Sequence, residues 1–216
     1  MEIKYFVRTI ESSNVNLPIE YEEILDTEHL YVKSFINALY KINDYNAVLM
    51  EDDIEVCSNF QEEIEKVINR YPENVINFFS KPERYFTTHF SDLFVYNQCT
   101  YFPKGFAKKL ANRMMKFYLD ERKYPKRQRY GQLLSIALIE LHIPHLIYRP
   151  CLVQHIDGKS TFDGSFCKRN TIWYKEYLDK LGIDMIEAYS EENQEKLKEL
   201  LELDRKRWYG EDYEKC

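Results

Sequence analysis

The amino-acid sequence predicts an α/β fold in which a mixed, mostly parallel sheet is flanked by helices and followed by a small helical appendage. Short apolar runs alternate along the first half of the chain with segments whose apolar residues recur at helical spacing. Glycine and proline are scarce, with 6 and 7 residues, and no repeat or low-complexity linker divides the chain. With 44% hydrophobic residues, a chain of 216 residues can bury the core that such a sheet requires.

The first half of the chain is expected to alternate between strands and helices. Residues 47–50, AVLM, are all apolar, which is typical of a short buried strand. Ser58 and Gln61 stand three positions apart and resemble a capping box at a helix start. The expected elements are, in order, a strand at 3–7, a helix at 28–42, a strand at 47–50, a helix that starts near Ser58 and runs through Ile68, and a strand at 74–79.

The second half is expected to contain more helix. Pro103 stands where a helix can begin, because proline fits the first helical turn. The expected elements are a strand at 93–102, a helix at 103–119, a helix at 131–141, an extended segment at 145–155, a polar loop, and helices at 171–181 and 191–207. We therefore expect a main domain at 1–169 and a helical appendage at 170–216.

The charge of the chain is unevenly distributed. The formal net charge is −6, yet residues 104–129 carry 10 basic and only 2 acidic side chains. Such a segment can bind a polyanion, or it can be the solvated side of a helix, and the sequence leaves both interpretations open.

Several features bear on the compartment. No stretch is long and apolar enough to cross a bilayer, and the first residues lack the charged-then-apolar pattern of a signal peptide. The cysteines are odd in number and scattered, without a CxxC pair, which favours a reducing, cytoplasmic setting over a disulfide framework or a zinc site. They are Cys57, Cys99, Cys151, Cys167 and Cys216.

Three consecutive acids, Glu51, Asp52 and Asp53, follow the apolar run at 47–50. Ligands of open α/β sheets gather outside the carboxyl ends of the strands, so these acids stand where a site is expected. Adjacent carboxylates in a cleft repel one another, and a hard cation such as Mg²⁺ or Mn²⁺ relieves the repulsion. Alternatively, the acids up to Glu55 complement the dipole of the following helix. Spacing alone does not decide between the two.

Three segments resemble parts of GT-A type glycosyltransferases. The run AVLMEDDIEV is similar to the family's strand-plus-acids element, the DxD motif. TYFPKGFAKKL resembles a strand-into-helix segment of the lipopolysaccharide-type glycosyltransferases, and RPCLVQHIDGKST is similar to the P-x-L-V-Q-H-x-G-x-x-S ending of several GT-A enzymes. The three segments lie between residues 46 and 161, in the order and spacing of the family.

The resemblance implies a GT-A, Rossmann-like fold and a metal-dependent transfer of sugar from a nucleotide-sugar, first of all a UDP-sugar. It implies that Asp53 binds Mn²⁺ or Mg²⁺ and that His155 completes the metal shell. Glu51 and Asp52 are then expected beside the donor. The chemistry is reasonable by itself, because carboxylate and imidazole both suit Mn²⁺ and the ion neutralises a departing diphosphate.

Further residues are assigned to the site by the same resemblance or by their chemistry. Arg8 stands in a place similar to residues that touch the nucleotide. Lys159 and Ser160 belong to the loop 157–169, which can fold over a diphosphate or be an ordinary surface connection. The family's usual catalytic acid is missing at the start of the 131–141 helix. Either another acid serves as base, with Asp92 the first to test, or the transfer proceeds with retention, or catalysis is impaired.

The acceptor and the overall activity remain open on the sequence. A glycan is the common acceptor of such enzymes, whereas the basic segment at 104–129 suits a hydroxymethylated DNA base. Tyr118, Tyr124 and Tyr130 lie among the cations as a stacking surface would. The alternatives are a non-catalytic or degenerate module that binds nucleotides or nucleic acid, and a nucleotidyltransferase. The oligomeric state is not indicated.

Overall fold

The computed structural model describes residues 1–9, 17–26, 31–80, 94, 96–120, 130–156, 158–159, 166–167 and 170–209. Its strands are β1 (Lys4–Thr9), β2 (Glu22–Leu25), β3 (Ala47–Glu51), β4 (Ile54–Val56), β5 (Val75–Asn77), β6 (Cys99–Phe102), β7 (His145–Ile147), β8 (Val153–His155), β9 (Gly158–Lys159) and β10 (Phe166–Cys167). Its helices are α1 (Tyr31–Ile42), α2 (Phe60–Arg70), α3 (Ala107–Leu119), α4 (Tyr130–Glu140), α5 (Lys175–Leu181), the 3-10 helix η1 (Glu187–Tyr189) and α6 (Glu191–Tyr209).

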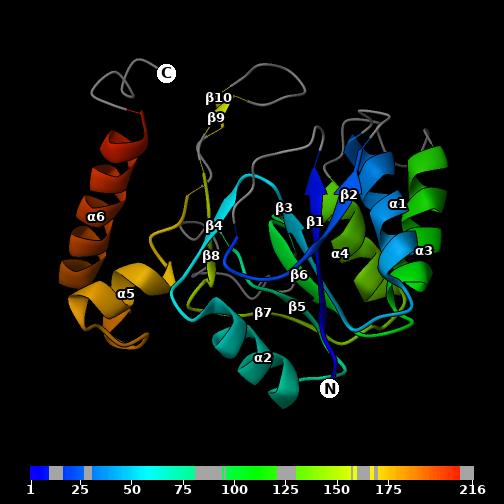
Figure 1. Cartoon of the computed structure of the whole chain (residues 1–216), viewed down its shortest axis with the longest axis horizontal. Coiled ribbons are helices and arrows are strands. Elements are labelled where there is room, and N and C mark those ends of the chain that lie inside the picture. The colour runs from blue at the N-terminus through cyan, green and yellow to red at the C-terminus, as the bar shows by residue number, and fades with distance from the viewer. Residues whose placement is uncertain are drawn as a thin grey trace.

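The centre of the molecule is a six-stranded sheet in the order β2-β1-β3-β6-β5-β7. β1 runs parallel to both β2 and β3, and β5 runs parallel to β7. β6 is antiparallel to its two neighbours, β3 and β5. The sheet is therefore mixed and mostly parallel, with helices around it, as the sequence predicts (Figure 1).

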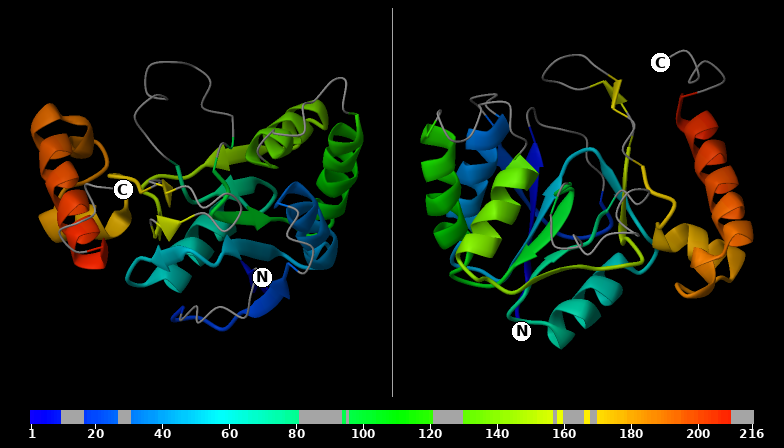
Figure 2. Two further views of the ribbon diagram at one scale, coloured as in Figure 1. Left: turned by 90° about the horizontal axis from the view of Figure 1, so that it is seen from above. Right: turned by 180° about the vertical axis from the view of Figure 1, so that it is seen from behind.

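Side chains of the central strands alternate between two cores, because successive residues of a strand point to opposite faces. Phe6 and Leu49 pack with α1, α3 and α4 on one face. Val7 and Met50 pack on the other face with α2 and with residues of the C-terminal helices. The resulting layers, helices on one side of the sheet and α2 on the other, can be followed in Figure 2.

The C-terminal segment shares the second core. Ile172 and Trp173, in a turn, and Tyr174, in extended backbone, are buried before α5, and Leu197 and Leu201 of α6 belong to the same cluster. α5 and α6 lie on the β4 and β8 side of the sheet (Figure 1). The division of the chain at residues 169 and 170 stays a prediction.

Two expected helix starts are corrected by the structure. The capping box at Ser58 is wrong, because α2 begins after Asn59 in a left-handed conformation and the Ser58 hydroxyl donates instead to Glu176 Oε1, 3.0 Å away. The helix expected from Pro103 begins only at Ala107, because residues 103–106 form a turn. Gly105 takes φ of 85° in that turn, which a residue without Cβ adopts readily.

Other differences concern short strands. β2 and β4 were not expected, and the predicted extended segment 145–155 forms two strands, β7 and β8, with a cis Arg149–Pro150 bond between them. Of the strand expected at 93–102, only Cys99–Phe102 forms a strand, β6, and the described residues 94 and 96–98 lie outside it. The helix expected at 171–181 begins at Lys175, because residues 171–174 are buried in extended or turn conformation. Among the described helices, none is both long and apolar enough to span a bilayer.

Candidate functional site

The polar residues of interest gather where β1, β2 and β3 end. β1 ends in Arg8 and Thr9, and β3 ends in Glu51. Asp26 follows β2, and its backbone N–H donates to the Thr9 carbonyl oxygen at 2.7 Å. All four residues are buried, with 1–9% of their surface exposed. Because the three strands are parallel, their carboxyl ends meet at one edge of the sheet, which is where open α/β sheets bind ligands.

A buried ion pair forms the inner part of this edge. Arg8 Nη2 donates to Glu51 Oε2 at 2.6 Å, and Arg8 Nη1 donates to the Ser34 hydroxyl at 3.2 Å. The Tyr130 hydroxyl donates to Glu51 Oε1 at 2.9 Å, and the Tyr130 ring stacks on Phe35 at a centroid distance of 4.5 Å. Charge-assisted bonds of this kind are strong, so the Arg8 and Glu51 side chains are held in fixed positions.

Burial determines the electrostatics of Glu51 and Asp52. It raises the pKa of Glu51, while the Arg8 guanidinium opposes the rise and the charge of Asp53 adds to it. Burial also raises the pKa of Asp52, a hydrogen bond with Thr9 opposes the rise, and Asp53 again adds to it. Both carboxyls are thus less acidic than usual partly because Asp53 lies near, and a cation at Asp53 would reduce that repulsion.

Asp53 and His155 lie side by side although they are far apart in the sequence. β4 and β8 form an antiparallel ladder in which Ile54 is the partner of His155. The N–H of Ile156 donates to the Asp53 carbonyl oxygen at 2.7 Å. The His155 Nε2 atom then lies 3.0 Å from Asp53 Oδ2, and the His155 side chain is 2% exposed while that of Asp53 is 48% exposed. The pair therefore has a buried side and a side open to solvent.

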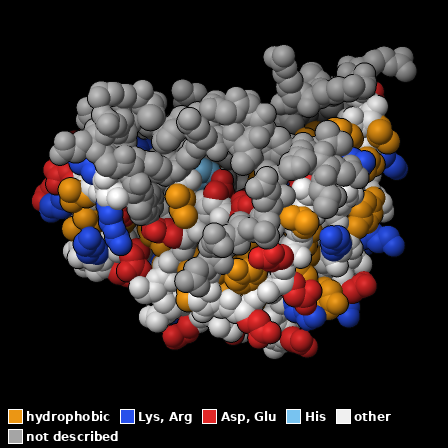
Figure 3. Space-filling model, turned by 45° about the horizontal axis from the view of Figure 1, so that its top comes forward, with side chains coloured by type: hydrophobic (Ala, Val, Ile, Leu, Met, Phe, Trp, Pro, Cys, Tyr) orange, Lys and Arg blue, Asp and Glu red, His pale blue; other side chains and the backbone are white. Residues whose placement is uncertain are grey.

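This pair has the donor chemistry of a Mn²⁺ or Mg²⁺ site. It offers one carboxylate oxygen and one imidazole nitrogen, which suit these ions when phosphate and water supply the other ligands. Within the described part of the chain, no group of three or more His, Cys, Asp or Glu side chains is placed to hold a metal. Phosphate oxygens of a bound nucleotide would suit a metal at Asp53 and His155 as further ligands. Figure 3 views the molecule from the side at which β1 and β3 end, and a histidine is visible there beside acidic side chains.

Comparison with protein-family models gives no match, and neither does comparison with curated proteins. The family is therefore not shown by these comparisons. The resemblance to GT-A enzymes stays a prediction.

The structure describes some of the predicted site residues and not others. Arg8, Glu51, Asp52 and Asp53 lie at one edge, because β1 and β3 are parallel neighbours, and His155 joins them through β8. Asp92 and Ser160 lie outside the described residues. Lys159 is described only as backbone of β9, which pairs with β10.

Two residues at this edge were missed by the sequence analysis as site residues. Asp26 follows a strand, β2, that itself was not expected. Tyr130 was considered as a stacking residue, but its contact with Glu51 was not foreseen. Once β2 is known, the position of Asp26 directly after a strand marks it as a candidate site residue. A local signal for the Tyr130 contact is lacking, because the two residues belong to distant segments.

The described lysines of the basic segment are exposed. Lys104, Lys108, Lys109 and Lys116 lie on the outer side of α3 and of the turn before it, while Arg113 pairs with Glu140 of α4. Exposed lysines suit both a polyanion-binding surface and an ordinary solvated helix face, so the two interpretations remain open.

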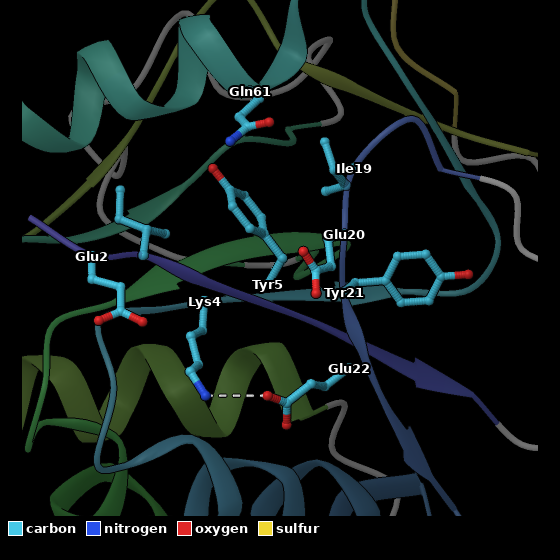
Figure 4. A pocket seen from close by; sticks show the side chains of 9 residues that line it. Glu2, Lys4, Tyr5, Ile19, Glu20, Tyr21, Glu22 and Gln61 are labelled. Atoms are coloured by element: carbon cyan, nitrogen blue, oxygen red, sulfur yellow. Dashed lines mark hydrogen bonds and ion pairs between the residues drawn. The ribbon is translucent and has the colours of Figure 1, made fainter.

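A depression of about 400 Å³ lies at the other end of β1 (Figure 4). Its lining includes Glu2, Lys4, Tyr5, Glu20 and Gln61. Glu2, Lys4 and Tyr5 precede or begin β1, Glu20 precedes β2, and Gln61 is on α2. Arg8 and Thr9 end β1, so the depression is separate from the edge described above. The Tyr5 hydroxyl donates to Glu65 at 3.2 Å and is thereby engaged in packing β1 against α2.

Proposed function

We propose that the protein is a metal-dependent glycosyltransferase that moves a sugar from a nucleotide-sugar to an acceptor hydroxyl. The observation that carries the proposal is the 3.0 Å approach of His155 Nε2 to Asp53 Oδ2. It agrees with the family resemblance, which pairs an early carboxylate with a late histidine. A UDP-sugar is the first donor to test.

Asp53 and His155 would hold Mn²⁺ or Mg²⁺, and the ion would supply neutralising charge for the departing diphosphate. The chain's own residues have separate tasks. Arg8 contributes a fixed positive charge at the end of β1, and its pairing with Glu51 keeps that charge from rearranging. Asp52 and Asp26 stand at the same edge, where they can accept hydrogen bonds from donor hydroxyls. Positioning and preorganised charge are the main sources of rate in such a site.

The acceptor is a glycan or a hydroxymethylated DNA base. In favour of DNA, the basic segment 104–129 ends directly before Tyr130, and Tyr130 contacts Glu51 at the site. The salt dependence of acceptor binding distinguishes these two acceptors. Binding of a polyanion weakens steeply as salt increases, because each neutralised phosphate releases counterions, whereas binding of a neutral glycan is insensitive.

The proposal is tested with four variants in two matched pairs. Asp53→Asn and His155→Asn alter the candidate ligands. Asp179→Asn makes the same change at an exposed ion pair with Lys175, and His142→Asn makes it at an exposed residue with φ of 52°, a conformation that asparagine tolerates. The measurements are thermal shifts with UDP-sugars, with and without Mn²⁺, and release of UDP.

We expect Mn²⁺-dependent stabilisation by a UDP-sugar in the wild type and in both controls. Asp53→Asn and His155→Asn should each weaken Mn²⁺ binding by more than about tenfold, because even residues that only support a ligand commonly cost that much. Stabilisation by nucleoside triphosphates alone would point to nucleotidyl transfer instead. Nucleotide binding without UDP release would point to a non-catalytic module.

A further inference from the structure

A chain of side-chain hydrogen bonds connects α6 with the candidate metal ligand His155. Asn170 Nδ2 donates to the His155 carbonyl oxygen at 2.7 Å. Arg205 Nε, on α6, donates to Asn170 Oδ1 at 3.2 Å. The two bonds fix the Asn170 amide in one orientation, because its N–H₂ group must face a carbonyl and its oxygen must face a guanidinium. Asn170 is 3% exposed, so water does not easily replace either partner.

The neighbouring residue of β8 is held in a similar way. The fully buried Gln154 side chain donates from Nε2 to the Thr171 carbonyl oxygen at 2.9 Å, and its Oε1 accepts from the Thr171 N–H at 2.7 Å. Nε2 also lies 3.2 Å from the Tyr177 hydroxyl of α5. Leaving a buried amide without partners costs about 1–3 kcal/mol, so these contacts define the position of β8 well.

The α6 end of the chain of bonds is itself anchored. Leu197 and Leu201 of α6 are buried in the core that also contains Met50 and Val153. Arg205 Nη1 pairs with Glu202 Oε1 at 2.5 Å, and the Arg205 side chain is 15% exposed. The guanidinium therefore reaches Asn170 from a helix that is packed in place, and not from a loosely held tail.

We propose that Arg205 is a positioning residue of the site: through Asn170 it holds the backbone of His155 and so sets the imidazole against Asp53. The consequence for metal binding rests on the proposed function. The positioning itself is a property of the metal-free protein, because every contact in it joins atoms of the chain. α6 then helps to position a residue of the site, although none of its residues is expected to touch the donor.

The experiment compares Arg205→Gln, which removes the cation, with Arg205→Lys, which keeps it. Lys198→Gln is the control, since it removes a cation from an exposed ion pair of the same helix. Mn²⁺ affinity is measured by electron paramagnetic resonance, global stability by urea unfolding, and local opening by hydrogen exchange at the Ile156 amide. That amide is the informative one, because it donates to the carbonyl oxygen of Asp53.

We expect Arg205→Gln to weaken Mn²⁺ binding by about tenfold, in the range that supporting residues of metal ligands show. Arg205→Lys should stay within about twofold of the wild type, as should Lys198→Gln. Exchange at Ile156 should become faster in Arg205→Gln relative to exchange in the core of the sheet. In an Asn170→Ala background, Arg205→Gln should not weaken Mn²⁺ binding further, because the hydrogen bond from Arg205 to the Asn170 side chain is already lost.

Three results would overturn the inference: equal Mn²⁺ affinity of Arg205→Gln and Lys198→Gln, failure of Arg205→Lys to restore the affinity, or additive effects of Arg205→Gln and Asn170→Ala. If the wild type binds no Mn²⁺, the proposed function fails, and hydrogen exchange alone then decides. Faster exchange at Ile156 in Arg205→Gln but not in Lys198→Gln would support positioning, and unchanged exchange would refute it.

Discussion

Glu55 of β4 offers a test of the electrostatics next to the site. Its side chain is partly buried, and burial raises its pKa to about 7, with Asp204 and Glu176 adding to the rise and Arg207 opposing it. The folded protein therefore holds a proton at Glu55 more tightly than the unfolded chain does. Its contribution to stability is greatest below pH 4.5 and is lost as pH rises through about 7.

Replacement of Glu55 by glutamine removes this titration. The difference between the ordinary value of 4.5 and about 7 corresponds to about 3 kcal/mol of unfolding free energy at pH 8. Partial exposure screens the charge, so we expect a gain of about 1–2 kcal/mol at pH 8 and little gain at pH 4.5.

The assay is urea unfolding of the wild type and Glu55→Gln between pH 4.5 and 8, with a chelator present so that no metal binds at the neighbouring Asp53. Glu195→Gln serves as control, because the Glu195 side chain on α6 is 70% exposed. The reasoning is refuted if the stability difference between Glu55→Gln and the wild type stays the same across this pH range.

Two further substitutions test the packing that supports the site. Arg8→Met should destabilise the protein by about 3–5 kcal/mol at pH 7, because it leaves the Glu51 carboxylate buried without its cation, and Arg8→Met with Glu51→Met should recover much of that loss in urea unfolding. A double variant as unstable as Arg8→Met alone would contradict this account. Leu197→Ala should cost about 2–5 kcal/mol by the same assay, because Leu197 is completely buried between α6 and the core. A loss below about 0.5 kcal/mol, the usual effect of a surface change, would show that α6 is not anchored there.

Elements with a strong local pattern could be predicted from the sequence. The strand at 47–50 and α2 follow from the apolar run and from the helical spacing of buried residues such as Ile64 and Ile68. β2 could not be found in this way, because it is an edge strand in which only Ile24 is buried. β4 is three residues long and is defined by its pairing with β8. β8 is distant in the sequence, so a local pattern does not predict the pairing.

The same distinction applies to the candidate site. The acids at the end of β3 are visible in the sequence because a carboxylate cluster directly follows a buried strand. The nearness of Asp53 and His155 was expected only through a family resemblance, since the β4–β8 ladder that joins them is a long-range contact. The role of Tyr130 as a partner of Glu51 depends on how α4 packs against β3, and residue spacing does not encode it.

The buried segment before α5 has a practical consequence for anyone who shortens this chain. Trp173 and Tyr174 are each 1% exposed, and the N–H of Cys151 donates to the Trp173 carbonyl oxygen at 2.7 Å. Truncation before residue 170 would remove two large aromatic rings from the interior and uncover the apolar surface that they fill. Such a fragment should aggregate, so expression work is best done with the C-terminal helices retained.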